Sequence, residues 1–363
     1  MNGYNVHMLK CHVGWRGFAC PAEGPDERLF AQLIEARAQL TAQRYLRCFG
    51  AALDDAGPGV ADVIRAAAQT FEGARAVEWT QLARVTQFHA SEAAALVVQL
   101  AAAGQRGDWR MKLEAPTQLR WNTSLLPRAS TVEVRWHADA PSLRCDDQLI
   151  EPAACERLDT VAELAVVPAR GLAPGMRDTG RLWEFELFES ISPATRATFA
   201  ALVDQLAART PSYSSWIRRI VRELVPVTAP KGFYTSGGVG HGLVFLSFNE
   251  QLAQLGEALV HESSHQYFEL VTAIAPVDDG SDSTLYYSPL KHTGRPLDRI
   301  LYTFHAVGNM LLYFRECGED AYVARTESRV RDQAKQLAAP LRSSGALTAL
   351  GRDLFEPLWE RLF

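Results

Sequence analysis

Two histidines four residues apart, with a glutamate directly after the first, are the residues in this chain best placed to do chemistry. His261, Glu262 and His265 stand in the run Ala-Leu-Val-His-Glu-Ser-Ser-His-Gln-Tyr-Phe-Glu-Leu. In an α-helix, side chains at positions i and i+4 lie one turn apart on the same face. Two imidazoles in that arrangement can bind one divalent metal ion, and the glutamate can reach a metal-bound water. We therefore predict a metal-binding helix with His261 and His265 as ligands and Glu262 as the catalytic carboxylate.

The position of a third protein ligand is left open by the sequence. Glu269 lies a further turn along the helix, about 6 Å from His265 along its axis, which places it away from the ion. A second helix, expected to begin at Pro296, has an apolar face. Beside that face it carries a stripe of polar residues at helical spacing: Asp298, Tyr302, His305 and Asn309. His305 is the only imidazole in the stripe and is the predicted third ligand, with His292 as runner-up; the stripe also fits a solvent-exposed helix face.

A zinc-dependent hydrolase is the plainest interpretation of the HExxH pattern, with Glu262 as the general base that deprotonates a zinc-bound water. Two common extended forms of the motif are absent. Phe268 and Val271 occupy the positions where one form has glycine and a third histidine. The other form, with a downstream glutamate in an Asn-Glu-x-x-(Ser/Ala)-Asp segment, also fails to match. The zinc hydrolase is kept as an alternative.

Several short segments follow one another in a recognisable order: a Gly-rich run from Ser236 to Gly242, the strand-like Leu243-Val244-Phe245-Leu246-Ser247, the metal helix, Tyr286-Tyr287-Ser288-Pro289, and Arg295-Pro296-Leu297. With these segments, residues from about 195 to 315 resemble a family of HExxH-motif peptide-modification proteins encoded near ribosomal peptide natural products (RiPPs). Some of that family are iron(II)- and 2-oxoglutarate-dependent peptide β-hydroxylases. This chain has Leu290-Lys291 where family members often have Trp-Arg.

The resemblance implies an iron(II)- and 2-oxoglutarate-dependent dioxygenase that hydroxylates a peptide or a carrier-tethered amino acid. Arg295 would hold the distal carboxylate of 2-oxoglutarate, because its planar fork pairs bidentately with carboxylates. Lys291 is the weaker alternative to Arg295, and hydroxyl contacts to the same carboxylate are expected from Tyr287 and Ser288. The residues expected to contact substrate are His241 and Tyr302. A degenerate, non-catalytic metalloprotein that binds peptides is a further alternative.

The expected fold class is α+β, predominantly α-helical, with three regions. Residues 1–116 form a helical region, because helix-forming residues recur at helical spacing between 26 and 105. Residues 117–190 form a small, mostly β region, where apolar and polar residues alternate and Asp146-Asp147 predicts a turn. Residues 191–363 form the helical, zincin-like metal-binding half.

Within that half, helices are expected over 192–209, 216–225, to about 270, from 296 and over 321–363, with a strand at 243–248. Ser192 followed by Pro193 is typical of a helix start. Ser247 with Glu250 predicts a capping box for the metal helix.

Composition narrows the class of protein. The chain has 363 residues and a net charge of −5, which gives no indication of nucleic-acid binding. Its longest apolar run, near residues 93–103, is about half the ~20 residues that a membrane span needs, and no signal peptide is visible. Six scattered cysteines without a CxxC pair favour reduced thiols. We expect a cytoplasmic protein without a membrane partner, and the oligomeric state stays open.

Overall fold

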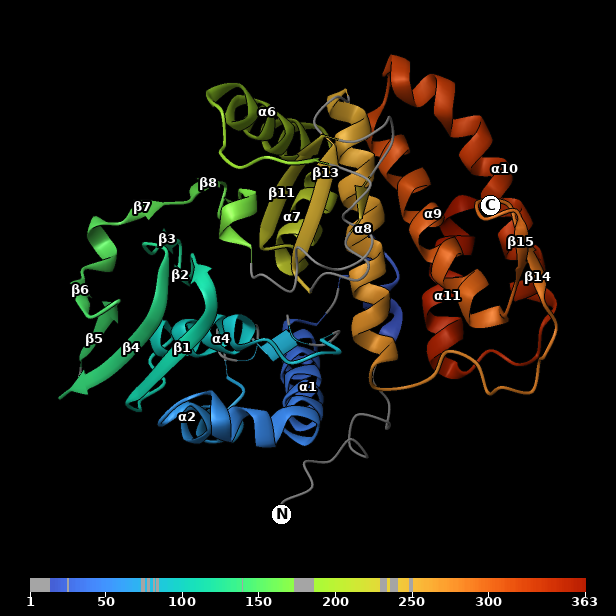
Figure 1. The fold of residues 1–363 in the computed structure, drawn as a ribbon. Coiled ribbons are helices and arrows are strands. Elements are labelled where there is room, and N and C mark those ends of the chain that lie inside the picture. Colours follow the sequence, from blue (N-terminus) through green and yellow to red (C-terminus); the bar gives the residue numbers. More distant parts are fainter. Residues whose placement is uncertain are drawn as a thin grey trace.

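The α+β fold expected from the sequence is confirmed by a computed structural model. The structure describes residues 14–24, 26–72, 76, 79–80, 82, 85–138, 140–172, 186–228, 234–235, 241–247 and 251–363. Figure 1 shows a curved antiparallel sheet at the left, a second sheet with its helices in the centre, and a layer of long helices at the right.

The first sheet is antiparallel, in the order β1-β4-β5-β6. Its strands are β1 (Trp109–Thr117), β4 (Ala129–His137), β5 (Ala140–Cys145) and β6 (Gln148–Ile150). The helices that share its apolar core are α1 (Glu27–Ala56), α2 (Val60–Ala67) and α4 (Ala90–Ala102). Asp146 and Asp147 both have positive φ between β5 and β6, so the predicted turn is confirmed as a two-residue hairpin turn.

Strand β1 begins within the region that was expected to be helical. Trp109, Met111 and Leu113 point into the core, whereas the two basic residues between them are exposed. This period of two is typical of a half-buried strand. A small three-stranded sheet lies beside the first one and consists of β2 (Arg120–Trp121), β3 (Ser124–Leu125) and β7 (Glu156–Arg157).

The second sheet has the order β12-β13-β11-β9-β8, with β10 beside β11. Its strands are β8 (Asp159–Val161), β9 (Leu164–Val166), β10 (Glu186–Leu187), β11 (Glu223–Thr228), β12 (Tyr234–Thr235) and β13 (Leu243–Ser247). The central strand β11 pairs in parallel with β9 and β13. Four of its six residues are buried, as in strands that are covered on both faces.

Helices α6 (Pro193–Arg209) and α7 (Pro211–Ile220) precede β11. The predicted start of α6 is confirmed, because the Ser192 side chain accepts a hydrogen bond from the Thr195 N–H at 3.1 Å. The helix predicted over 216–225 is wrong at both ends. It begins at Pro211 and ends at Ile220, since the following apolar residues pair with neighbouring strands instead.

The C-terminal part begins with α8 (Leu252–Thr272), the helix that carries His261 and His265. It continues with the hairpin β14 (Tyr286–Ser288) and β15 (Thr293–Arg295), then α9 (Leu297–Cys317), α10 (Ala321–Ser343) and α11 (Ala349–Leu362). The predicted capping box is wrong, because Ser247 ends strand β13 opposite Val227 and α8 starts at Leu252 with Gln251 as N-cap.

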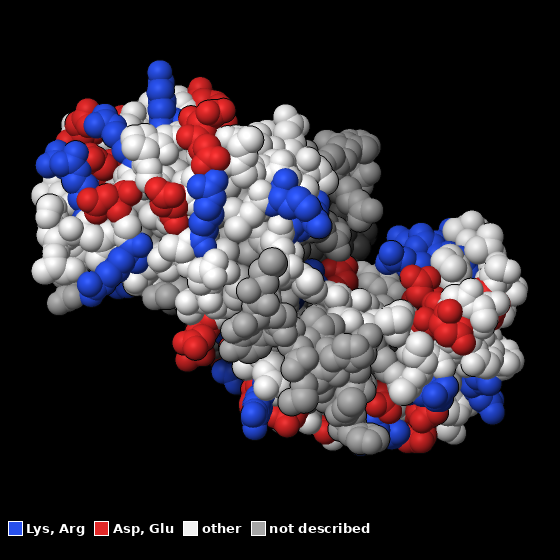
Figure 2. All heavy atoms as spheres, turned by 90° about the horizontal axis from the view of Figure 1, so that it is seen from below, with Lys and Arg blue, Asp and Glu red and all other residues white. Residues whose placement is uncertain are grey.

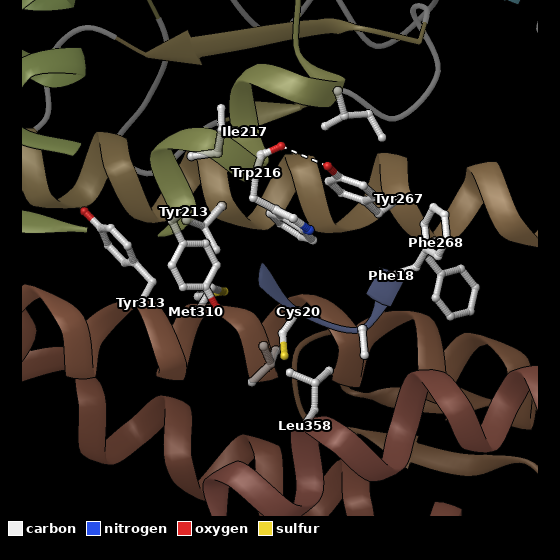
Figure 3. Close-up of a cluster of buried hydrophobic side chains, with 14 of the residues drawn as sticks. Phe18, Cys20, Tyr213, Trp216, Ile217, Tyr267, Phe268, Met310, Tyr313 and Leu358 are labelled. Atoms are coloured by element: carbon white, nitrogen blue, oxygen red, sulfur yellow. Dashed lines mark hydrogen bonds between the residues drawn. The ribbon is translucent and has the colours of Figure 1, made fainter. Parts of the chain in front are cut away.

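A cluster of aromatic side chains holds α8 against α7 and α9 (Figure 3). The rings of Trp216 and Tyr267 stack with centroids 4.1 Å apart, and the Tyr267 hydroxyl donates to the Trp216 carbonyl at 3.0 Å. Phe18 of the N-terminal turn η2 (Trp15–Phe18), and Cys20, which precedes the turn η3 (Pro21–Glu23), belong to the same core. Helix α8 is therefore packed on several sides by residues distant in the sequence.

On the face seen in Figure 2, acidic and basic side chains are interspersed rather than gathered into one patch of a single sign. None of the helices in the described ranges is both long and apolar enough to cross a membrane.

Candidate metal centre

His261 and His265 lie on successive turns of α8, as predicted. Their rings are nearly perpendicular, at 87°, with centroids 4.4 Å apart. The spacing follows from helix geometry, because residues i and i+4 share a face. The pair is thus held by the backbone of a single well-packed helix.

The tautomer of His261 is set by a contact with α9. Its Nδ1 lies 3.2 Å from the Sδ atom of Met310. A thioether sulfur is only a weak acceptor, so this contact favours the proton on Nδ1. The lone pair is then on Nε2, as in metal-binding histidines whose second ring nitrogen is hydrogen-bonded. The sequence did not mark Met310 as a residue of the site, because an apolar residue on a helix is typical of the core.

His265 is oriented by an aromatic contact. Its ring lies face to face with that of Tyr302, with an angle of 4° and centroids 4.0 Å apart. The Arg299 guanidinium lies 5.8 Å from the other ring centroid of this stack, that of Tyr302. Tyr302 was expected to contact substrate; in the structure it packs on His265. The Nδ1 atom of His265 is buried, and no hydrogen-bond partner for it lies in the described residues.

Both imidazoles are held neutral. Burial lowers the pKa of His261 to about 4, helped by the positive charge of Lys291. Burial also lowers the pKa of His265 well below its usual value, with further contributions from His261, His305 and Lys291. Neutral imidazoles are the form that binds metal ions. Two ring donors with a buried, unpaired nitrogen therefore fit two ligand positions of a divalent metal.

The predicted third ligand, His305, uses one of its two ring nitrogens in a hydrogen bond to the N-terminal turns. It is fully buried, and its Nε2 lies 2.9 Å from the carbonyl oxygen of Phe18. A carbonyl only accepts hydrogen bonds, so Nε2 carries the proton and the lone pair of the ring is on Nδ1. Asn309, one turn further, donates in the same way to the carbonyl of Ala19 at 2.8 Å. These members of the polar stripe fasten the N-terminal turns to α9.

Within the part of the chain that the structure describes, no three His, Cys, Asp or Glu side chains are grouped so as to hold a metal ion. The described donor set is the pair His261 and His265. His292, the runner-up ligand, is exposed in the hairpin turn, and its Nδ1 lies 3.1 Å from the Tyr287 hydroxyl.

Glu262 is buried at the sheet-facing side of α8. Gln266, one turn along the same face, accepts from the Gly242 N–H at 2.7 Å and donates to the Leu243 carbonyl at 3.1 Å. These bonds fix the face that carries both side chains against strand β13. The glutamate is therefore held beside the histidine pair with its carboxylate screened from bulk water.

The hairpin β14–β15 and its turn carry the residues that were predicted to bind the distal carboxylate. Lys291, in its turn, is the cation whose charge acts on both histidines. Arg295 is half-buried in β15 opposite Tyr286. The Ser288 side chain is fully buried, and its hydroxyl has no hydrogen-bond partner in the described ranges. The Tyr287 side chain is exposed.

One buried carboxyl was not singled out in the sequence. Glu257 lies one turn before His261 on α8 and is 4% exposed. The Tyr322 hydroxyl of α10 donates a hydrogen bond to it. Burial raises the pKa of Glu257 to about 7, although Tyr322 and Arg329 act in the opposite direction. Its position at i−4 from His261 was the only signal that marked it.

Comparison of the chain with known proteins found no family model that matches it and no similar curated protein.

Proposed function

We propose that the protein is an iron(II)- and 2-oxoglutarate-dependent oxygenase that hydroxylates a side chain, at its β-carbon, of a peptide or carrier-tethered amino acid. The observation that carries the proposal is the pair of neutral imidazoles of His261 and His265 on one face of α8, with the positive charge of the exposed Lys291 acting on both. A cation next to a metal site repels the metal ion, unless an anion is bound between them. A 2-oxo acid meets that need, since its keto-acid end chelates the metal and its distal carboxylate pairs with a cation.

In this proposal the chain's own residues bind and orient. His261 and His265 hold the metal, with their rings positioned by Met310 and Tyr302. Lys291 holds the distal carboxylate, and the Ser288 hydroxyl is a second donor in the same hairpin. Glu262 acts on the groups around the metal from the face of α8 that lies against strand β13. When bound, iron(II) with 2-oxoglutarate supplies the oxidising chemistry: oxygen gives one atom to the substrate C–H bond and one to succinate, with release of carbon dioxide.

The test is anaerobic reconstitution of the protein with iron(II) and 2-oxoglutarate, followed by visible absorption. We expect the weak metal-to-ligand charge-transfer band of an iron-bound 2-oxo acid. His261→Ala and His265→Ala should abolish the band. Lys291→Ala should raise the 2-oxoglutarate concentration needed for half-maximal band intensity by at least tenfold. Lys335→Ala, which removes an exposed lysine on α10, is the matched control and should leave it unchanged.

A folded, iron-loaded protein that shows no band would end the oxygenase proposal. Zinc-dependent cleavage of peptides under anaerobic conditions, lost in Glu262→Gln, would establish the hydrolase instead. If Arg295→Ala weakens 2-oxoglutarate binding and Lys291→Ala does not, then Arg295 holds the distal carboxylate.

A further inference from the structure

His241 is a buried histidine with unusual surroundings. It directly precedes Gly242, at the start of strand β13, and is 7% exposed. Neither ring nitrogen has a hydrogen-bond partner among the described residues. A neutral imidazole carries one donor and one acceptor, and leaving both unpaired in the interior is costly. Buried polar groups of this kind point to a bound molecule as the missing partner.

Arg222, the residue before strand β11, approaches the histidine. Its backbone N–H donates to the Gly242 carbonyl at 2.7 Å. Its side chain runs alongside Gly242, since a Cβ atom on that glycine would lie 3.5 Å from the Arg222 Cγ. The Arg222 side chain itself is exposed.

Arg37 approaches from helix α1. It is 9% exposed, and its Nη1 donates to the Glu269 carbonyl of α8 at 2.8 Å. The Gly242 N–H is bound to Gln266, less than one turn earlier on α8. The helix therefore serves as a common support that brings Arg37 and the His241 loop together.

The two charged side chains that act on His241 are both positive. Burial lowers the pKa of His241 well below its usual value, and the guanidinium groups of Arg37 and Arg222 lower it further. The imidazole is thus neutral and able to donate one hydrogen bond. A positive potential at a buried, unpaired donor favours an anionic acceptor over a water molecule.

We propose that His241, Arg37 and Arg222 form a binding site for an oxyanion, the carboxylate or phosphate group of a small ligand. In this site the imidazole N–H donates to one oxygen, and the two guanidinium groups balance the charge. Gln266 directly follows His265. The oxyanion site therefore adjoins the same turn of α8 as the metal centre, on the neighbouring face of the helix, and its formation needs no metal.

The experiment is calorimetric titration of EDTA-treated protein with sodium succinate and, separately, with inorganic phosphate. We expect saturable binding of at least one of them, and the stronger of the two identifies the chemistry. Arg222→Gln should weaken that binding at least tenfold, the loss typical of a charged hydrogen bond. The matched control is Arg218→Gln, an exposed arginine one turn earlier on α7, which should bind as the wild type does.

A second measurement does not depend on any arginine variant. The ring nitrogen resonances of His241, identified by their loss in His241→Gln, should shift when the ligand is added to wild-type protein. The His261→Ala variant should still bind the anion, so a failure of the oxygenase proposal leaves this result standing. Absence of binding by both anions, unchanged His241 resonances, or equal affinity of Arg222→Gln and Arg218→Gln would each overturn the site.

Discussion

Replacing Glu257 by glutamine should change how the stability of the protein depends on pH. The carboxyl is buried on α8 and accepts a hydrogen bond from Tyr322. Burial raises its pKa from 4.5 to about 7. Glutamine keeps an acceptor oxygen for the Tyr322 hydroxyl but cannot ionise.

The sign and size of this pH effect on stability follow from proton linkage. Between pH 4.5 and about 7, the folded protein keeps the Glu257 proton while the unfolded chain has lost it. The stability contributed by this proton is therefore complete below pH 4.5 and is lost as the pH rises through about 7. The pKa difference of roughly 2.5 units, at about 1.4 kcal/mol per unit, amounts to about 3 kcal/mol.

The assay is urea unfolding of EDTA-treated wild type and Glu257→Gln between pH 5 and 8.5. The variant should gain about 3 kcal/mol relative to wild type across this range and be the more stable protein at pH 8. Taking the difference cancels the buried histidines, whose lowered pKa values affect both proteins equally. Glu319→Gln, at an exposed site, should differ from the wild type in free energy of unfolding by a small amount that does not change with pH. If the stability difference between Glu257→Gln and the wild type does not change with pH, or shifts in favour of the wild type as the pH rises, the reasoning is refuted.

Three further changes test how the metal helix is supported. Tyr302→Leu should lower iron(II) affinity at least tenfold in a metal titration, because His265 loses the ring that orients it, whereas Tyr302→Phe should keep wild-type affinity. His305→Leu should leave metal affinity unchanged but lower the free energy of unfolding in urea by about 1–3 kcal/mol, because the Phe18 carbonyl loses its hydrogen-bond donor. A complete loss of metal binding by the folded variant would identify His305 as a metal ligand. Gly256→Ala should lower the free energy of unfolding by about 1–3 kcal/mol in the same assay, because the new Cβ would lie 2.1 Å from the Tyr313 hydroxyl oxygen. Adding Tyr313→Phe should recover part of this loss of stability. If the effects of the two substitutions simply add, this explanation is contradicted.

Local features of this chain were predictable because they depend on neighbours in the sequence. The helical period places His261 and His265 on one face of α8 without reference to the rest of the fold. Ser192 and Pro193 start α6, and Asp146-Asp147 form the turn between β5 and β6, for equally local reasons. The apolar run of β13 was recognisable for the same reason.

Tertiary structure decided the features that depend on partners far along the chain. His305 was the natural third ligand by type and position, yet its Nε2 is paired with the carbonyl of Phe18, 287 residues away. The apolar residues after Ile220 became strand β11 because β9 and β13 flank them. Likewise, only the tertiary fold brings the charge of Lys291 close enough to act on both histidines. Sequence periodicity sets which side chains share a face, whereas burial and long-range pairing set what those side chains meet.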